Sequence, residues 1–342
     1  MFGSFVQTAS PAALVGYYTI AGRLLCVEAQ DDWTAEWVAN FLNGFYLSRT
    51  AAPEQERAAV ALKVRRAQPP NVPSGLQTFA INHGVCHTDG TQYFLVVDQS
   101  LIIIKAPASR TIEVTFGTSA HARHSVALVN VFSYGLQAAL RRAGAYDVHA
   151  AGAVEPASGA GALIIGPSSS GKTTLTLKLA ARGWRYLSDD MVLLHETRAG
   201  LEVAGLRRLF SVAAASLAGS QLPQLDAALG APVASDPSKR RLVPEIIFPA
   251  GRAESCRTRA LFFTQVVDAD ETSVVDMPAR TAMQQLIRLC PWATYDAHTA
   301  PDYLRVLARL ANDCRAYELR AGRDLLRDQA RAADLLAPYL KE

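Results

Sequence analysis

The chain has 342 residues, 50% of them hydrophobic, so it is long enough for a full core and for two domains. Its formal net charge is only +3 and its basic residues are scattered, which argues against a nucleic-acid-binding protein. No stretch is long and apolar enough for a membrane span, and the amino terminus lacks the basic and apolar regions of a signal peptide. We therefore expect a soluble, cytoplasmic protein.

The cysteines point to the same compartment. They are odd in number and lie far apart, without the CxxC spacing of a zinc or redox site. We expect reduced thiols rather than disulfides or metal ligands. The five positions are Cys26, Cys86, Cys256, Cys290 and Cys314.

Residues 16–115 read mostly as strands, because β-branched and aromatic segments alternate with Gly, Asp and Pro. The clearest strand segments are 17–29, 91–99 and 101–106. Residues 52–75 end in a proline-rich stretch and are predicted to form a surface connection.

One helix interrupts this region, over residues 32–48. Its aromatic residues recur every four positions, so they form one apolar stripe that would pack in a core. The stripe consists of Trp33, Trp37, Phe41 and Phe45.

A long amphipathic helix is predicted over residues 119–144, where Arg141 and Arg142 form a basic last turn and Gly144 ends the helix. The mostly strand-like pattern of the preceding residues ends at this helix, so we place the domain boundary nearby. A smaller β-rich α+β domain would cover residues 1–120, and a second domain would cover residues 121–342.

The second domain begins with a strand, loop, helix and strand in succession. The order of these elements predicts a βαβ unit that feeds a largely parallel sheet, and hence an α/β fold. The strands are predicted over 146–154, 162–166 and 185–194, with the helix over 173–183 and a helical carboxyl end.

The segment GPSSSGKT satisfies the G-x-x-x-x-G-K-[ST] pattern of a phosphate loop, and it lies between an apolar strand and a helix as that motif requires. Glycines allow backbone N–H groups to surround an anion, the helix start adds a positive dipole end, and the lysine adds a charge. The predicted nucleotide-binding residues are Gly166, Pro167, Ser168, Ser169, Ser170, Gly171, Lys172, Thr173 and Thr174.

Two adjacent carboxylates, Asp189 and Asp190, follow the strand after the phosphate-loop helix, at the sheet edge where ligands gather. The negative charges of two adjacent carboxylates repel each other unless a cation lies between them or one of them is protonated. With a bound nucleotide and Mg²⁺, one carboxylate would hold the metal and the other would take a proton from an acceptor hydroxyl. The alternative is a solvated turn.

Other polar residues would complete this site. His149 precedes the loop strand and would orient or tune Asp189, unless it serves packing alone. Two basic groups could neutralise a transferred phosphate or grip an acidic substrate, although each could equally be a solvated surface charge. These groups are Arg207 and Arg208 in one segment, and Lys239, Arg240 and Arg241 in the other.

Residues 146–195 resemble the catalytic core of the HPr kinase/phosphorylase family, with a His on a strand, a phosphate loop, a helix ending in RG and a strand ending in a double Asp. The resemblance implies a P-loop catalytic domain related to phosphoenolpyruvate carboxykinase, and serine phosphorylation of a small carrier protein. It also implies that Lys172 holds the β- and γ-phosphates and Thr173 binds Mg²⁺. Asp189 would then be the catalytic base, His149 its partner and Asp190 a metal-side carboxylate.

The chain departs from that family in three places. Ser169 stands where the family's loop usually has a third glycine, and Thr173 stands where it usually has a serine, which is a chemically conservative change. The family's glycine-rich signature after the double Asp has no counterpart. The chain therefore looks closer to divergent HPr-kinase-like proteins, such as those in lasso-peptide clusters that phosphorylate a precursor peptide at its carboxyl-terminal serine.

From these observations we expect an ATP- and Mg²⁺-dependent kinase that phosphorylates a serine hydroxyl of a peptide or protein. The amino-terminal domain would recognise this acceptor. A nucleotide-binding regulator without transfer activity and a kinase of a small metabolite are the alternatives. The sequence leaves open the phosphate donor, a reverse phosphorylase activity and a homo-oligomeric state.

Overall fold

The computed structural model describes residues 13–52, 59–67, 71–81, 84–97, 100–105, 110–116, 126–217, 222, 225–233, 236–328 and 330–341. The chain divides into two compact units, which separate between Ala139 and Leu140. The short segments Ile20–Arg23 and Gly44–Leu47 also belong to the second unit. The boundary that we placed at residue 120 lies outside the described residues.

The first unit is built on a nine-stranded sheet with the order β3-β1-β2-β4-β9-β8-β7-β6-β5. Its helices are α1 (Asp32–Leu42) and α2 (Val126–Arg142), which continues into the second unit. The strands are β1 (Ala13–Ile20), β2 (Arg23–Ala29), β3 (Ser48–Thr50), β4 (Val60–Arg66), β5 (Gln77–Ile81), β6 (Gly84–Thr88), β7 (Gln92–Val97), β8 (Ser100–Lys105) and β9 (Thr111–Phe116).

Strand β4 corrects the expectation that residues 52–75 form a surface connection. It pairs in parallel with both β2 and β9, so it is an interior strand of the sheet. Val60, Leu62 and Val64 are buried and alternate with the less buried Ala61, Lys63 and Arg65, which is the period-2 pattern of a strand with one face on a core. The prolines that suggested a connection lie outside this alternation.

The predicted aromatic helix is confirmed as α1, although it is shorter than expected. Asp31 caps it by accepting a hydrogen bond from the Thr34 N–H at 2.7 Å. Trp37 packs edge-on against Phe132 of α2, with ring centroids 5.6 Å apart. Phe45 lies beyond the helix end at Leu42 and belongs to the second unit, so the four-residue stripe does not continue to it.

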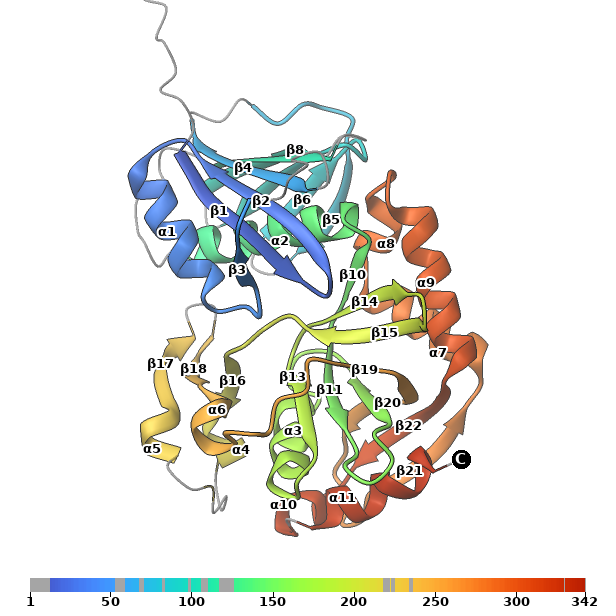
Figure 1. Cartoon of the computed structure of the whole chain (residues 1–342). Helices are drawn as coiled ribbons and strands as arrows, with labels where there is room; N and C mark the ends of the chain where they lie inside the picture. The colour runs from blue at the N-terminus through green and yellow to red at the C-terminus, as the bar shows by residue number, and fades with distance from the viewer. Residues whose placement is uncertain are drawn as a thin grey trace, which may run out of the picture. The chain divides into compact units, whose positions relative to one another are not determined.

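The second unit contains three sheets, with the orders β10-β14-β15-β19, β13-β11-β12-β20-β22-β21 and β16-β18-β17. Figure 1 shows the course of these elements. The strands are β10 (Ala145–Val148), β11 (Ala150–Val154), β12 (Gly161–Ile165), β13 (Arg185–Ser188), β14 (Val192–Thr197), β15 (Gly200–Gly205), β16 (Phe210–Ala213), β17 (Leu229–Val233), β18 (Asp236–Leu242), β19 (Ser255–Cys256), β20 (Thr258–Val266), β21 (Ser273–Met277) and β22 (Arg315–Ala321).

The helices of this unit include a long pair, α7 and α9, that lie side by side in Figure 1. The helical carboxyl end is confirmed by the short helices α10 and α11 and the turn η2 at the end of the chain. The helices are α3 (Lys172–Ala181), α4 (Ala214–Leu217), α5 (Leu225–Ala228), α6 (Pro244–Ile247), α7 (Ala279–Leu289), α8 (Trp292–Tyr295), α9 (Ala300–Asp313), α10 (Asp324–Arg327), α11 (Arg331–Leu336) and the short 3₁₀ turn η2 (Ala337–Leu340).

The six-stranded sheet is mixed, which corrects the expectation of a largely parallel sheet. β20 pairs in parallel with β12 and β22, whereas β11 pairs antiparallel with both β12 and β13. β12 and β13 therefore point the same way but lie on either side of β11. The helix between them, α3, crosses over one intervening strand, because the preceding strand β11 has already taken the place beside β12.

Helix α3 is anchored on two faces, which makes it a rigid support for the loop before it. Leu175 and Leu179 pack into a core formed by the six-stranded sheet and α11. Leu177 and Ala180 pack into a second core with Tyr186 and residues of the three-stranded sheet. Gly183 follows the helix with a φ of +84°, the left-handed conformation common after a helix end.

Candidate active site

The segment 166–173 forms the connection between β12 and α3, as the motif predicts. A Cβ on Gly166 would lie 2.5 Å from Ser170 Oγ and 2.7 Å from the Thr264 carbonyl oxygen, so a larger residue does not fit there. Gly171 has a φ of +94° and Ser169 a φ of +65°. The serine that replaces a glycine of the resembled family thus sits in a left-handed conformation that favours glycine.

The ammonium group of Lys172 lies inside this loop. It donates hydrogen bonds to the carbonyl oxygens of Gly166 at 2.8 Å and Pro167 at 2.9 Å, and the residue is 5% exposed. Burial lowers its pKa, while the charges of Asp190 and Asp189 act in the opposite sense. The lysine therefore holds a positive charge at the point where the motif places phosphate groups, and Thr174 follows in the first turn of α3.

Asp189 contacts the phosphate loop. Its Oδ2 accepts hydrogen bonds from Thr173 Oγ1 and from the Ser211 N–H of β16, both at 2.9 Å. The side chain is fully buried, and its Oδ1 has no hydrogen-bond partner among the described residues. Burial and the neighbouring Asp190 charge raise the pKa of this carboxyl group above its usual range.

Asp190 points to a different set of partners. His149 Nε2 donates to its Oδ1 at 2.8 Å, and Arg207 Nε lies 3.7 Å from its Oδ2. Its side chain is 33% exposed, so it is open to a ligand. Burial alone would raise its pKa, but the His149 hydrogen bond and the charges of Arg207, His149 and Lys172 hold the pKa well below its usual range.

These contacts correct the pairing that we expected for His149, which lies against Asp190 and not against Asp189. The reason is the strand register. β10 pairs with β14 at Val148 and Val192, and β11 pairs with β13 at Gly152 and Ser188, so the two segments keep one antiparallel register across the interruption. His149 lies in this interruption opposite the aspartate bend, where the two carboxylates turn to different sides.

Strand alternation decides which basic residues reach the site. Lys239 Nζ contacts Ser168 Oγ of the phosphate loop at 3.5 Å and Asp236 at 3.2 Å. Arg241, two positions along β18, donates to Ser211 Oγ at 2.8 Å. Arg240 points the other way and donates to the Gly230 carbonyl oxygen at 3.0 Å. Of the three basic residues predicted as candidates, Lys239 therefore contacts the loop and Arg241 contacts Ser211, whereas Arg240 does neither.

The consecutive residues Arg207 and Arg208 also contact different partners. Arg207 faces Asp190 and lies over the Phe45 ring, with 5.8 Å between its guanidinium carbon and the ring centroid. Arg208 is exposed and pairs with Glu245 at 3.3 Å, away from the aspartates. Phe45, which the sequence suggested as a helix core residue, thus supports an arginine of the site.

The residues present fit a Mg²⁺ ion bound with a nucleotide. Magnesium is commonly held by one or two protein oxygens together with substrate phosphates and water. Thr173 Oγ1 and the Asp189 carboxylate supply such oxygens side by side, and the unpartnered Oδ1 is available to a cation. Within the described ranges no cluster of three or more His, Cys, Asp or Glu side chains could hold a metal by protein ligands alone.

Behind this site lies a buried ion network that sequence reasoning missed. Asp296 accepts hydrogen bonds from Arg142 at 2.6 and 3.0 Å and from Arg141 at 3.4 Å. Arg141 also donates to Asp147 at 2.9 Å. Asp147 lies on β10, two residues before His149. The sequence shows the arginines only as a basic helix end, and nothing in it points to a partner more than 150 residues away.

No protein-family model matches the chain, and no curated protein matches it in sequence. In the part of the chain that the structure describes, no helix is long and apolar enough to cross a membrane.

Asp189→Asn is expected to stabilise the ligand-free protein at pH 8 by about 1–3 kcal/mol, because the neutral amide avoids burying a negative charge beside Asp190 and one unit of pKa corresponds to about 1.4 kcal/mol. Folding raises the pKa of Asp189, so the contribution of this carboxyl group to the free energy of unfolding is fully present at low pH. This contribution is lost as pH rises through the pKa that Asp189 has in the folded protein. The gain should therefore be small at pH 5 and grow towards pH 8. Thermal unfolding at both pH values checks this.

The control for that measurement is Asp190→Asn, which loses its charge-assisted contacts with His149 and Arg207 and should give no such gain. A melting temperature of Asp189→Asn below the wild-type value at pH 8 would contradict the prediction.

Proposed function

We propose that this protein is an ATP- and Mg²⁺-dependent kinase that transfers the γ-phosphate to a serine hydroxyl of a peptide or protein. The observation that carries the proposal is the division of the two aspartates. Asp189 is hydrogen-bonded to Thr173 of the phosphate loop, and Asp190 is hydrogen-bonded to His149 on the opposite side. A protein that only binds nucleotide needs the first contact but not the second.

The proposed roles follow these contacts. They are the reverse of the roles that the family resemblance implies for the two aspartates, because Asp189 now lies on the metal side and Asp190 is the base. Thr173 and Asp189 hold the metal, which neutralises charge on the phosphates when it is bound. Lys172 leaves the loop carbonyls to bind the β- and γ-phosphates. Asp190, oriented by His149 and more exposed than Asp189, takes the proton of the acceptor hydroxyl as the new oxygen–phosphorus bond forms and the bond to the β-phosphate breaks.

Two arginines near the aspartates support phosphate transfer rather than simple binding. Arg207 lies beside Asp190, and burial together with the charge of Arg207 lowers the pKa of Arg241, while Asp189 and Asp190 act in the opposite sense. Two guanidinium groups beside two carboxylates form a site for a group whose negative charge shifts during the reaction. The fold would be that of the P-loop catalytic domain of HPr kinase-like proteins.

The acceptor that the resemblance favours is a peptide ending in serine, such as a lasso precursor peptide, with the first unit recognising it. The test is incubation of the protein with ATP, Mg²⁺ and serine-containing peptides, each matched by a version with alanine in place of serine. Phosphoserine detected by mass spectrometry only in the serine peptides supports a kinase. Binding of ATP without transfer to any peptide or small hydroxyl compound would favour a nucleotide-binding regulator.

Nucleotide binding should depend on Lys172. Lys172→Ala removes a charge from the phosphate loop, so ATP affinity is expected to fall by about 2–4 kcal/mol, roughly 30- to 1,000-fold. Calorimetry measures this directly. Lys178→Ala on the same helix is the matched control, because that ammonium group contacts the Asp328 carbonyl oxygen and should leave affinity unchanged. Equal ATP affinity of Lys172→Ala and the wild type would remove the phosphate-loop assignment.

A further inference from the structure

The two aspartates decide which end of a phosphate donor lies on which side of the phosphate loop. They follow β13, and in the sheet order β13-β11-β12-β20-β22-β21 this strand lies to one side of β12, which leads into the loop. In the proposed reaction the γ-phosphate lies beside Asp190. The other end of the donor therefore points to the opposite side of the loop, towards the carboxyl ends of β20 and β22, where ligands of such sheets gather.

The carboxyl end of β20 supports the phosphate loop and presents an apolar side chain beside it. Thr264 Oγ1 donates a hydrogen bond to the Ser170 carbonyl oxygen at 3.2 Å. Val266 is the last residue of β20, lies on the same face as Thr264 and is 60% exposed. A Cβ on Gly171 would lie 3.5 Å from Val266 Cγ2, so the valine is next to the residue that precedes α3. A ligand that leaves the loop on this side meets Val266.

Two connections that contact each other extend this surface beyond Val266. Residues 267–272 join β20 to β21, and residues 322–323 join β22 to α10; we call these two connections the loop pair. The Gly322 N–H donates to Thr272 Oγ1 at 2.9 Å, and a Cβ on Gly322 would lie 2.6 Å from the backbone of the other connection. The loop pair is therefore a packed surface at the same sheet edge as the phosphate loop.

The loop pair carries hydrogen-bond acceptors that suit a sugar. Arg323 forms ion pairs with Asp268 and Asp270, whose side chains are 87% and 71% exposed. Carboxylate oxygens accept hydrogen bonds from the hydroxyl groups of a ribose. An apolar side chain at the loop with acceptors beyond it matches a nucleoside, which has an apolar base face and sugar hydroxyl groups.

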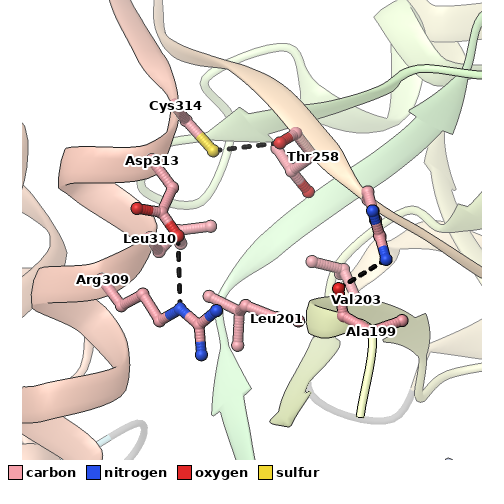
Figure 2. A pocket seen from close by; sticks show the side chains of 10 residues that line it. Ala199, Leu201, Val203, Thr258, Arg309, Leu310, Asp313 and Cys314 are labelled. Carbon is pink, nitrogen blue, oxygen red and sulfur yellow. Dashed lines mark hydrogen bonds and ion pairs between the residues drawn. The ribbon is translucent and has the colours of Figure 1, made fainter. Parts of the chain in front are cut away.

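The cavity drawn in Figure 2 lies too far away to hold this part of the donor. Its volume is about 190 Å³, and Leu201, Leu310 and Thr258 are among the residues that line it. Thr258 is the first residue of β20 and Val266 the last, so the two ends are about 26 Å apart at roughly 3.3 Å per residue. The nucleoside of a donor bound in the phosphate loop does not reach that cavity.

We propose that Val266 and the loop pair bind the nucleoside of the phosphate donor, which makes the donor a nucleoside triphosphate and not pyrophosphate. This inference rests on the proposed kinase function. Packing a nucleoside against Val266 removes apolar surface from water, a contribution that an inorganic polyphosphate cannot make. The phosphate loop holds the phosphates of either kind of donor, whereas Val266 distinguishes between them.

The experiment compares ATP with inorganic tripolyphosphate, each titrated calorimetrically with Mg²⁺ into the full-length protein. Both ligands carry three phosphates, so the ratio of their dissociation constants reports on the nucleoside. Val266→Asn should weaken ATP binding by about 3- to 10-fold and leave tripolyphosphate binding unchanged, because it removes an apolar contact without altering charge.

The matched control is Val275→Asn, the same substitution at a valine of β21 that is 50% exposed, and it should leave both affinities unchanged. Should Val266→Asn lose its thermal transition, Val266→Thr keeps the shape of the side chain and should shift the ratio in the same direction. The proposal is overturned if the Val266 variants keep the wild-type ratio, or weaken both ligands equally. Failure of the kinase proposal shows instead as absence of phosphoserine while the ratio still shifts, so the two results are separable.

Discussion

Asp190→Asn is expected to lower phosphate transfer by about 10²–10⁴, the usual span for loss of a general base, while ATP affinity stays close to the wild-type value. The asparagine keeps the size of the side chain and can still contact His149, but it cannot accept the proton of a hydroxyl. Asp190 is suited to this role because its side chain is 33% exposed, whereas Asp189 is fully buried against Thr173. The measurement is single-turnover transfer to a serine peptide alongside calorimetric ATP binding.

Asp189→Asn provides the contrast. Because Asp189 is the proposed metal-side carboxylate, its loss should raise the Mg²⁺ concentration needed for half-maximal activity, an effect that Asp190→Asn should not produce. His149→Gln should reduce transfer less than Asp190→Asn, since the imidazole acts by orienting that carboxylate. Wild-type transfer by Asp190→Asn together with a loss in Asp189→Asn would restore the roles implied by the family resemblance.

Asp296→Ala is expected to lower the free energy of unfolding of the second unit by about 3–5 kcal/mol, the scale for breaking a buried ion pair by removing one partner. Asp296 and Arg141 are essentially inaccessible to solvent, and Asp296 also accepts two hydrogen bonds from Arg142. Without the carboxylate, two guanidinium groups would lie close together in a buried place. Urea denaturation, followed by a probe in residues 140–341, measures the loss.

The control is Asp302→Ala on α9, which removes an exposed partner of Arg305 and should cost at most about 1 kcal/mol. The pH dependence supplies a second check. Burial raises the pKa of Asp296, but the Arg142 hydrogen bond and the charges of Arg141 and Arg142 bring it below its usual value. The stabilisation that Asp296 provides should therefore be present above the pKa that this group has in the unfolded chain. It should be lost as pH falls through the lower pKa of the folded protein. Equal unfolding free energies for Asp296→Ala and Asp302→Ala would contradict this account.

Local sequence was enough for the elements whose pattern is continuous along the chain. The strand and the helix on either side of residues 166–173 and the aromatic helix α1 are confirmed, because apolar runs and helical periodicity act between residues a few positions apart. The same reasoning failed for β4. Its alternating Val60, Leu62 and Val64 were outweighed by neighbouring prolines, although an interior strand needs only that short alternation.

Pairing between distant segments decides the contacts that the sequence left open or placed wrongly in the site. Which of Arg240 and Arg241 reaches Ser211 depends on which face of β18 turns towards β16, and a sequence of consecutive basic residues does not contain this information. The pairing of His149 with Asp190 likewise depended on the register between β10–β11 and β13–β14.

The sequence by itself determined the strand, loop and helix around residues 166–173, the presence of two carboxylates after β13 and the helical carboxyl end, since each rests on contiguous residues. Only the tertiary structure decided which aspartate contacts Thr173, which arginines reach the aspartates, and that Asp296 balances Arg141 and Arg142. The physical reason is that backbone register and strand alternation orient each side chain. Register depends on which strands pair, and those strands lie far apart along the chain. Alternation turns the side chains of two consecutive strand residues to opposite faces of the sheet.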